Sequence, residues 1–247
     1  MKTRNRQLLV AEQMLTYGRT ADVKKPIVFT PDKGADEFVK SDPLAFVVGV
    51  ILDQGIPAER AWAGPYELRR RLGHWDIGRI AEMSDDEIEM VFGMWPKLHR
   101  FWRVSAKRIR DAARRILQWY GGDAENIWGD KPRSDDLRRR FEEFNGIGQK
   151  KASMATNILA RDFGVPVRFP QGIDVSSDSH VRRVFVRAGL VDKGNEEEVV
   201  HTARQLNPDY PGELDLPAWL IGRQWCHPTN PACSNCPLDS ACPKVGV

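Results

Sequence analysis

Cysteine is confined to one end of this chain of 247 residues. The first 225 residues contain none, and all four cysteines then follow with the spacing Cys226-x6-Cys233-x2-Cys236-x5-Cys242. Prolines in and beside this stretch keep it out of regular helix. Four thiols in one short irregular loop predict a metal centre, either tetrahedral or cubane.

Two disulfides or a zinc ion are the alternatives to an iron-sulfur cluster here. The residues Met1 to Gln7 lead into an apolar stretch that Glu12 and Gln13 soon interrupt, so no secretory signal is apparent and an intracellular location is expected. Thiols stay reduced in that compartment, which disfavours disulfides. Zinc sites usually join two short Cys-x2-4-Cys loops, whereas only one such pair occurs here. An iron-sulfur cluster is therefore favoured over zinc.

Length and composition suit one large or two modest globular domains. The chain is 41% hydrophobic and 29% charged, which excludes a disordered or collagen-like protein. Its longest apolar run covers nine residues, 44–52. Because a helix needs roughly 20 apolar residues to cross a bilayer, no membrane partner is expected.

Charge is segregated along the chain although the net charge is only +3. Residues 97–115 carry eight basic side chains against one acid, and residues 82–89 carry five acids and no base. Two solvated helix faces of opposite sign are the favoured interpretation, and a phosphate-binding face is the alternative.

Helical periodicity runs through nearly all of the sequence and predicts an all-α fold. The expected helices cover residues 6–17, 44–54, 102–120, 135–144 and 196–206. Ser84 opens a capping box, and Ser134 and Asn195 are the expected N-caps of the helices that follow them. Loose segments are expected at 20–42 and 164–177, where proline, glycine and aspartate concentrate.

A helix, a Gly-x-Gly turn and a second helix are predicted over residues 141–152. Gly146 and Gly148 let the backbone turn tightly, and Ile147 between them is apolar enough to anchor the turn inward. The first amides of the second helix would then form an anion site, next to Lys150 and Lys151. Tight helical turns use glycine routinely, so a phosphate site and a plain turn both remain open.

These motifs together resemble the helix-hairpin-helix DNA glycosylases of the endonuclease III group, over roughly residues 44–242. The family's hairpin pattern Leu-Pro-Gly-Val-Gly-Arg-Lys-Thr-Ala lies over residues 144–152, and its Val-Asp-Thr-His element lies over residues 177–180. The cysteine spacing is the one with which this group binds a [4Fe-4S] cluster. The resemblance implies an all-α fold of two domains with DNA bound between them: a helical-barrel domain with the hairpin at 36–164, and a cluster domain at 1–35 and 165–247.

The resemblance also assigns roles to residues of the candidate site. Lys150 falls on the lysine that forms a Schiff base with C1′ of the sugar, and Asp178 on the carboxylate that stabilises positive charge there. Gln54 resembles the side chain that fills the gap left by a flipped-out base.

Further candidates surround those three residues. The hairpin residues Gly146, Ile147 and Gly148 are expected to bind DNA. Lys151 should contact phosphate or solvent, because it points about 100° away from Lys150 on a helix. His180 is expected to be a hydrogen-bonding partner near the site. The cluster is expected to shape a basic loop.

Three departures from the family pattern leave alternatives open. Asn145 replaces the proline before the hairpin. Residues 168–176 look inserted, which makes Asp174 a competitor for the role of Asp178. Gly49 occupies the place where the adenine-mismatch branch keeps a catalytic glutamate, which disfavours that branch.

The expected function is base excision from duplex DNA that contains a damaged base or an abasic site, with abasic-site lyase activity and oxidised pyrimidine favoured. The protein is expected to be a cytoplasmic, nucleoid-associated monomer. The alternatives are a glycosylase without lyase activity, acting on mismatched uracil or thymine or on alkylated purines, and a DNA-binding module without catalysis. The loop 94–102 could supply a wedge, or its aromatic side chains could belong to the core.

Overall fold

The computed structural model describes residues 2–20, 22, 23, 25 and 27–247. Those residues form helices and connecting loops with no β-strand among them, which confirms the all-α prediction. The α-helices are α1 (Lys2–Gly18), α2 (Lys33–Ser41), α3 (Pro43–Leu52), α4 (Ala58–Leu72), α5 (Ile77–Glu82), α6 (Asp85–Gly93), α7 (Trp102–Trp119), α8 (Ser134–Glu142), α9 (Gln149–Arg161), α10 (Ser179–Arg187), α11 (Glu196–Leu206) and α12 (Asp215–Gln224). Short 3-10 helices occur at Ala124–Ile127, Pro170–Gly172, Pro211–Leu214 and Cys233–Asn235.

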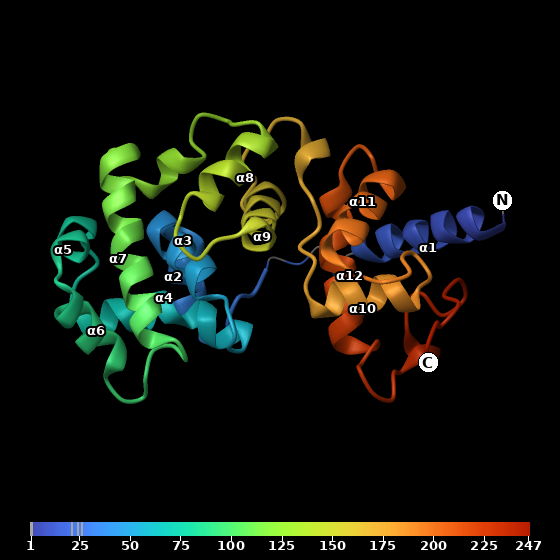
Figure 1. The fold of residues 1–247 in the computed structure, drawn as a ribbon, viewed down its shortest axis with the longest axis horizontal. Coiled ribbons are helices and arrows are strands. Elements are labelled where there is room, and N and C mark those ends of the chain that lie inside the picture. Colours follow the sequence, from blue (N-terminus) through green and yellow to red (C-terminus); the bar gives the residue numbers. More distant parts are fainter. Residues whose placement is uncertain (1, 21, 24, 26) are drawn as a thin grey trace.

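Two hydrophobic cores divide the helices into two lobes (Figure 1). The first core is built from residues between Phe29 and Leu159, which belong mainly to α2 through α9. The second combines α1 with α10, α11, α12 and the cysteine-bearing tail. The chain therefore passes between the lobes twice, once after α1 and once after α9.

Helix α3 lies in the middle of the first core. Its sequence, PLAFVVGVIL, is apolar on every face, as expected of a helix that is buried all round. The Asp42 carboxylate begins the helix by accepting a hydrogen bond from the Ala45 amide at 2.7 Å. The helix ends at Leu52, two residues before the predicted end, because side chains from other elements bind its last carbonyl groups, as described below.

Two predicted helix starts are confirmed. Ser84 forms a complete capping box with Glu87 at the start of α6. Asn195 caps α11 by accepting a hydrogen bond from the Glu198 amide at 2.9 Å. Both signals are local, so they do not depend on the tertiary fold.

Two other local predictions are wrong. The segment 20–42 is not irregular throughout, because α2 occupies its last third, with Asp32 as its N-cap. Positions 21, 24 and 26 of that segment lie outside the described residues. Ser134 does not cap α8: its hydroxyl donates to the Phe169 carbonyl and ties α8 to the segment that looks inserted.

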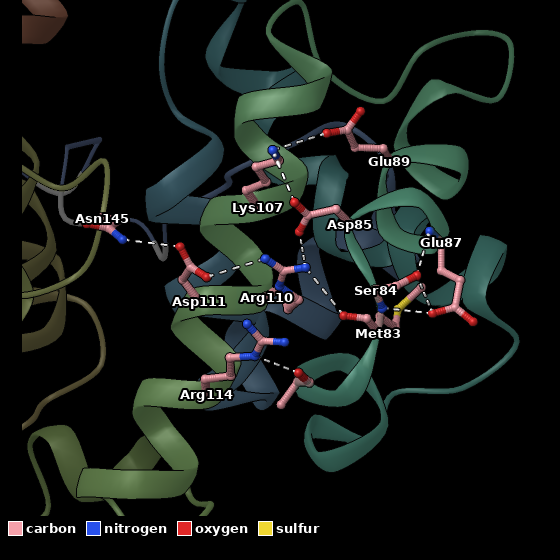
Figure 2. A network of polar contacts seen from close by, with 11 residues as sticks. Met83, Ser84, Asp85, Glu87, Glu89, Lys107, Arg110, Asp111, Arg114 and Asn145 are labelled. Atoms are coloured by element: carbon pink, nitrogen blue, oxygen red, sulfur yellow. Dashed lines mark hydrogen bonds and ion pairs between the residues drawn. The ribbon is translucent and has the colours of Figure 1, made fainter.

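The basic segment 97–115 forms most of α7, and its cations meet the acids of α6 (Figure 2). Lys107 Nζ lies 3.2 Å from Asp85 Oδ2 and 3.7 Å from Glu89 Oε1. Arg110 also pairs with Asp85, and Arg103 Nε lies 3.4 Å from Glu89 Oε2. The two helix faces of opposite charge are present, but they are not simply solvated, because Arg103, Lys107 and Arg110 pair with acids of α6.

Candidate active site

A cleft of about 1500 Å³ separates the two lobes. The first lobe lines it with the turn after α3 and with the hairpin and first turn of α9. The second lobe lines it with the start of α10 and with one side of α12. The predicted site residues found in this lining are Gln54, Gly146, Gly148, Lys150, Lys151, Asp178 and His180.

The hairpin between α8 and α9 has the predicted tight turn. Gly146 has φ of +90°, and a Cβ on it would lie 2.6 Å from Arg108 Cδ, so the position requires glycine. Ile147 is only 4% exposed and anchors the turn in the first core, so the hairpin offers DNA its backbone rather than this side chain. Asn145, the residue that replaces the family's proline, donates to Asp111 Oδ2 at 3.2 Å and holds the hairpin against α7 (Figure 2).

The start of α9 opens into the cleft. Gly148 is its N-cap, with open space around the position of a Cβ. The first amides of a helix have no carbonyl partner within it, and the helix dipole adds positive potential at this end. The geometry therefore provides a backbone site for an anion beside Lys150.

The two adjacent lysines occupy opposite environments. Lys150 is exposed and lines the cleft. Lys151 is 9% exposed, and its Nζ donates to the Ile51 carbonyl at 2.7 Å. Burial lowers the pKa of Lys151 to about 8, although the negative charge of Asp53 opposes that shift. The prediction that Lys151 contacts phosphate or solvent is wrong, because the turn of one residue along α9 directs it into the protein.

His99 holds the backbone just beyond the end of α3. Its Nε2 lies 3.1 Å from the Leu52 carbonyl oxygen and 3.0 Å from that of Gln54. Its Nδ1 accepts a hydrogen bond from the Phe101 amide at 3.0 Å, which places the proton of a neutral ring on Nε2. Burial lowers the pKa of His99, so the ring is neutral at physiological pH and donates to both carbonyls. Together with Lys151, this ring ends α3 early and fixes the turn that presents residues 53 and 54.

Gln54 is exposed at the mouth of the cleft, as its predicted role requires. Its Oε1 accepts a hydrogen bond from Arg108 Nη1 at 3.0 Å. Arg108 also lies across Gly146, so one arginine contacts both the candidate plug and the hairpin. Sequence reasoning missed Arg108, because nothing in the basic segment distinguishes it from its neighbours.

The two aspartates that compete for the role of the charge-stabilising carboxylate lie in different surroundings. Asp178 is the N-cap of α10, and its Oδ1 accepts hydrogen bonds from the amides of His180 and Val181, both at 2.8 Å. Asp178 also lines the cleft. Asp174, in contrast, has a side chain that is 3% exposed, and both its oxygens accept hydrogen bonds from Arg204 at 2.7 Å. Of these two aspartates, Asp178 is therefore the one that meets the cleft.

His180 and Arg223 lie on the second lobe's side of the cleft. His180 Nδ1 accepts a hydrogen bond from Arg183 Nη2 at 3.0 Å, and its ring packs edge-on against Trp219. Arg223 Nη2 reaches across to Glu59 Oε1 of the first lobe at 2.9 Å. That ion pair bridges the two walls of the cleft.

Asp53 is a cleft residue that the sequence did not single out. It precedes Gln54, lines the cleft, and accepts no side-chain hydrogen bond from any described residue. Burial raises its pKa, whereas the positive charges of Lys151 and Lys150 lower it. Its position next to Gln54 was the one signal that could have drawn attention to it.

The four cysteines come together in the second lobe. All are free and half-buried, and they line one small apolar pocket between α10, α12 and the tail. Three sulfurs have N–H neighbours of the kind that tunes a cluster: Arg187 lies 3.7 Å from Cys226 Sγ, the Leu238 amide 3.5 Å from Cys236 Sγ, and the Lys244 amide 3.4 Å from Cys242 Sγ. Within the described residues, no group of three or more donors converges on the position of a single metal ion. Four cysteines on one pocket can supply the one thiolate per iron that a cubane cluster needs.

The loop 94–102 is largely outside the core. Trp95 is 90% exposed and Phe101 is 45% exposed, whereas Trp102 packs partly against the first core. Arg71 donates to the carbonyls of Met94 and Pro96 and holds the loop in place. The exposure of Trp95 and Phe101 favours a contact surface over a place in the core.

Known proteins are similar to this chain in both sequence and fold. It is 29% identical to endonuclease III of Bacillus subtilis over 230 residues, which cover 88% of this chain and 92% of the relative. It is 28% identical to endonuclease III of Thermotoga maritima over 142 residues, and there it spans only 57% of the relative's length. No protein-family model matches the chain.

Solved structures match along almost the whole chain. A trapped endonuclease III–DNA covalent intermediate matches with a TM-score of 0.65 and 18% identity, over 96% of this chain and 93% of that one. A thermostable thymine-DNA glycosylase matches with a TM-score of 0.65 and 16% identity, over 99% of this chain and 98% of that one. Within the described residues, no helix is long and apolar enough to cross a membrane. The sequence matches and the shared fold together support an endonuclease III-like helix-hairpin-helix DNA glycosylase.

Proposed function

We propose that the chain is a base-excision DNA glycosylase with abasic-site lyase activity, which acts as a monomer on a base flipped out of duplex DNA. The observation that carries the proposal is the convergence of Lys150, Asp178 and the hairpin amides on one cleft. The hairpin sequence supplies Lys150 and the amides, and the Asp-x-His element supplies Asp178. Simple phosphate binding would require neither the lysine nor the aspartate.

The chemistry follows from the positions of these side chains. A base that leaves C1′ takes the bonding electrons with it, so positive charge develops on the sugar. The Asp178 carboxylate stabilises that charge across a partly desolvated cleft. The Lys150 amine attacks C1′ and forms an iminium linkage, which makes elimination of the 3′ phosphate easy.

The mouth of the cleft supplies the groups that hold the distorted duplex. Flipping a base out leaves a gap in the stack, and a side chain that enters the gap offsets part of the lost stacking. Gln54 fits that role because it is exposed at the cleft mouth and oriented by Arg108. The free amides at the start of α9 bind the backbone phosphate nearby.

The proposed substrate is an oxidised pyrimidine, as in endonuclease III. An adenine-mismatch activity is disfavoured by the packing at Gly49, where a Cβ would lie 2.5 Å from the Trp62 ring and leave no room for a glutamate. Mismatched thymine or uracil is the second candidate, because a thymine-DNA glycosylase shares the fold over nearly its whole length. An alkylated purine is the third.

We further propose that Cys226, Cys233, Cys236 and Cys242 bind a [4Fe-4S] cluster. The proposal rests on their family spacing, their common pocket and the N–H groups that approach three of the sulfurs. Such a cluster would hold the tail against α10 and α12 without taking part in base release.

Borohydride trapping on a duplex with one preformed abasic site tests the central proposal. Wild-type protein should form a covalent band, because borohydride reduces the iminium between lysine and DNA. Lys150→Ala should lose the band while keeping its affinity for the same duplex.

The control for this experiment is Lys107→Ala, a change on α7 that keeps Lys150 and should keep the band. If wild-type protein binds the duplex but gives neither a band nor base release, the proposed enzyme activity is overturned. The chain would then be a DNA-binding module without catalysis. A wild-type protein that releases a base without a band would instead be a glycosylase without lyase activity.

A further inference from the structure

Two of the carboxyl groups that line the cleft, Asp53 and Asp178, have contrasting surroundings. Asp178 Oδ1 accepts two backbone amides at 2.8 Å at the start of α10. Those amides and the helix dipole stabilise its negative charge and fix its orientation. Asp53 has no such support: no described residue donates a hydrogen bond to its carboxylate. One carboxyl is therefore held in one orientation by the backbone, and the other is free to contact a substrate.

The groups that face Asp53 come from three elements. Lys151 and Lys150 lie on α9, Asp178 lies at the start of α10, and Glu59 lies in α4. The two lysines favour the ionised form of Asp53, and the two carboxylates and burial favour its neutral form. Because burial is the strongest of these influences, the pKa of Asp53 is raised. A carboxyl with a raised pKa beside a second carboxyl that backbone amides hold in place suits one acid–base group and one charge-stabilising group.

The backbone around Asp53 is held from both sides. Lys151 binds the Ile51 carbonyl, and His99 binds the carbonyls of Leu52 and Gln54. This fixes the position of Asp53 within the cleft without contacting its carboxylate. A group held by its backbone alone keeps its side chain available for substrate.

We propose that Asp53 is the proton carrier of the reaction at Lys150, while Asp178 remains the anion that stabilises the sugar. The inference rests on the proposed glycosylase and lyase function. Asp53 first accepts a proton from the Lys150 ammonium, which leaves a neutral amine and a carboxylic acid. The amine attacks C1′, the electrons of the glycosidic bond pass to the base, and Asp53 gives its proton to that base. The carboxylate is thereby restored.

The same transfer operates at a preformed abasic site. The neutral Lys150 amine adds to the C1′ aldehyde, and the Asp53 acid protonates the hydroxyl group that leaves as water. An iminium forms, and Asp53 is again ionised. The rate of iminium formation at an abasic site therefore reports on Asp53 without requiring the damaged base to be known.

The test measures the rate of trapping by cyanoborohydride on an abasic-site duplex between pH 5 and pH 9. Asp53→Asn should form the adduct about 10²-fold more slowly than wild type. Wild-type trapping should fall on the acid side at a pH above the ordinary range of an aspartate, and Asp53→Asn should lack that acid limb. Asp53→Glu should recover part of the rate, and added formate should accelerate Asp53→Ala but not wild type.

The outcomes separate this inference from the function on which it rests. Absence of a wild-type band overturns the lyase proposal and the role of Asp53 with it. A wild-type band that Asp53→Asn forms at the same rate across the pH range overturns the role of Asp53 alone. Slow trapping in Asp53→Asn without rescue by glutamate or formate would assign Asp53 a structural role and overturn proton transfer. Asp86→Asn, a change at an exposed carboxylate of α6, serves as the matched control.

Discussion

The α6–α7 surface and the cleft both carry many charged side chains. The two regions differ in whether those side chains have a partner. On the surface, Lys107 and Arg110 meet Asp85 in ion pairs, in which Lys107 and Asp85 are half-exposed and Arg110 is nearly buried (Figure 2). In the cleft, Lys150 forms no ion pair with a described residue, and Asp53 receives no hydrogen bond. Paired surface charges contribute little beyond local order, whereas unpaired and partly desolvated charges retain the capacity to react. The segment richest in basic residues is thus not the segment most suited to chemistry.

The largest effect should come from removing the fixed anion of the cleft. Asp178→Asn should slow base release about 10² to 10³-fold, because the amide cannot offer a full negative charge to the sugar. Asp174→Asn should instead lower stability through loss of its Arg204 contact and leave the rate per folded molecule unchanged. Single-turnover base release by the two variants, corrected for folded fraction, compares them. An equal rate loss in both would remove the distinction between the two carboxylates.

Loss of one cysteine should affect the second lobe before the cleft. Cys236→Ser should abolish the broad visible absorption expected of wild type and lower the thermal stability of the tail and α12. Iron and sulfide analysis together with the absorption spectrum measures this. Colourless wild-type protein that contains zinc would contradict the cluster assignment.

Buried Lys151 should make stability depend on pH in a window where the α6–α7 pairs do not titrate. Its pKa falls from 10.5 to about 8 on folding, so the unfolded chain binds more protons between those values. Stability should therefore rise with pH across that window, by up to about 3 kcal/mol relative to Lys151→Met, because each pKa unit is worth about 1.4 kcal/mol. Urea unfolding of both proteins from pH 7.5 to pH 10.5 measures the difference. Parallel stability curves would show that the lysine is not buried as described.

The smallest effect should follow a change on the α6–α7 surface. Lys107→Ala should alter stability by less than about 1 kcal/mol, because its ion pairs with Asp85 and Glu89 are half-exposed. Its affinity for an abasic duplex should stay within about twofold of wild type, since the charge is already neutralised. Binding measured at two salt concentrations tests this. A large loss of affinity with a reduced salt slope would show that DNA contacts this surface.

Sequence patterns predicted the features that depend on near neighbours. The capping box at Ser84, the cap at Asn195 and the buried Ile147 of the hairpin all need only local chemistry, and all three are present. The order of the motifs also carries the resemblance to the endonuclease III group, and that resemblance implied the two-domain helical fold.

Features set by distant contacts could not be predicted in the same way. Helix α3 ends early because Lys151 and His99, far away in the sequence, bind its last carbonyls. The same contacts bury Lys151, so its predicted exposure failed although its helical position was right. Arg108 is distinguished from the other cations of α7 only by the fold, which brings it to Gln54 and Gly146.

The most direct test of the account is to identify the lysine that carries the trapped DNA. After borohydride reduction on an abasic duplex, nuclease digestion and fragmentation mass spectrometry of the hairpin peptide should locate the sugar remnant. We expect the remnant on Lys150, the exposed lysine of the cleft. A remnant on Lys151 would contradict the proposed role of Lys150, because the buried lysine would then have to leave the Ile51 carbonyl to become the nucleophile.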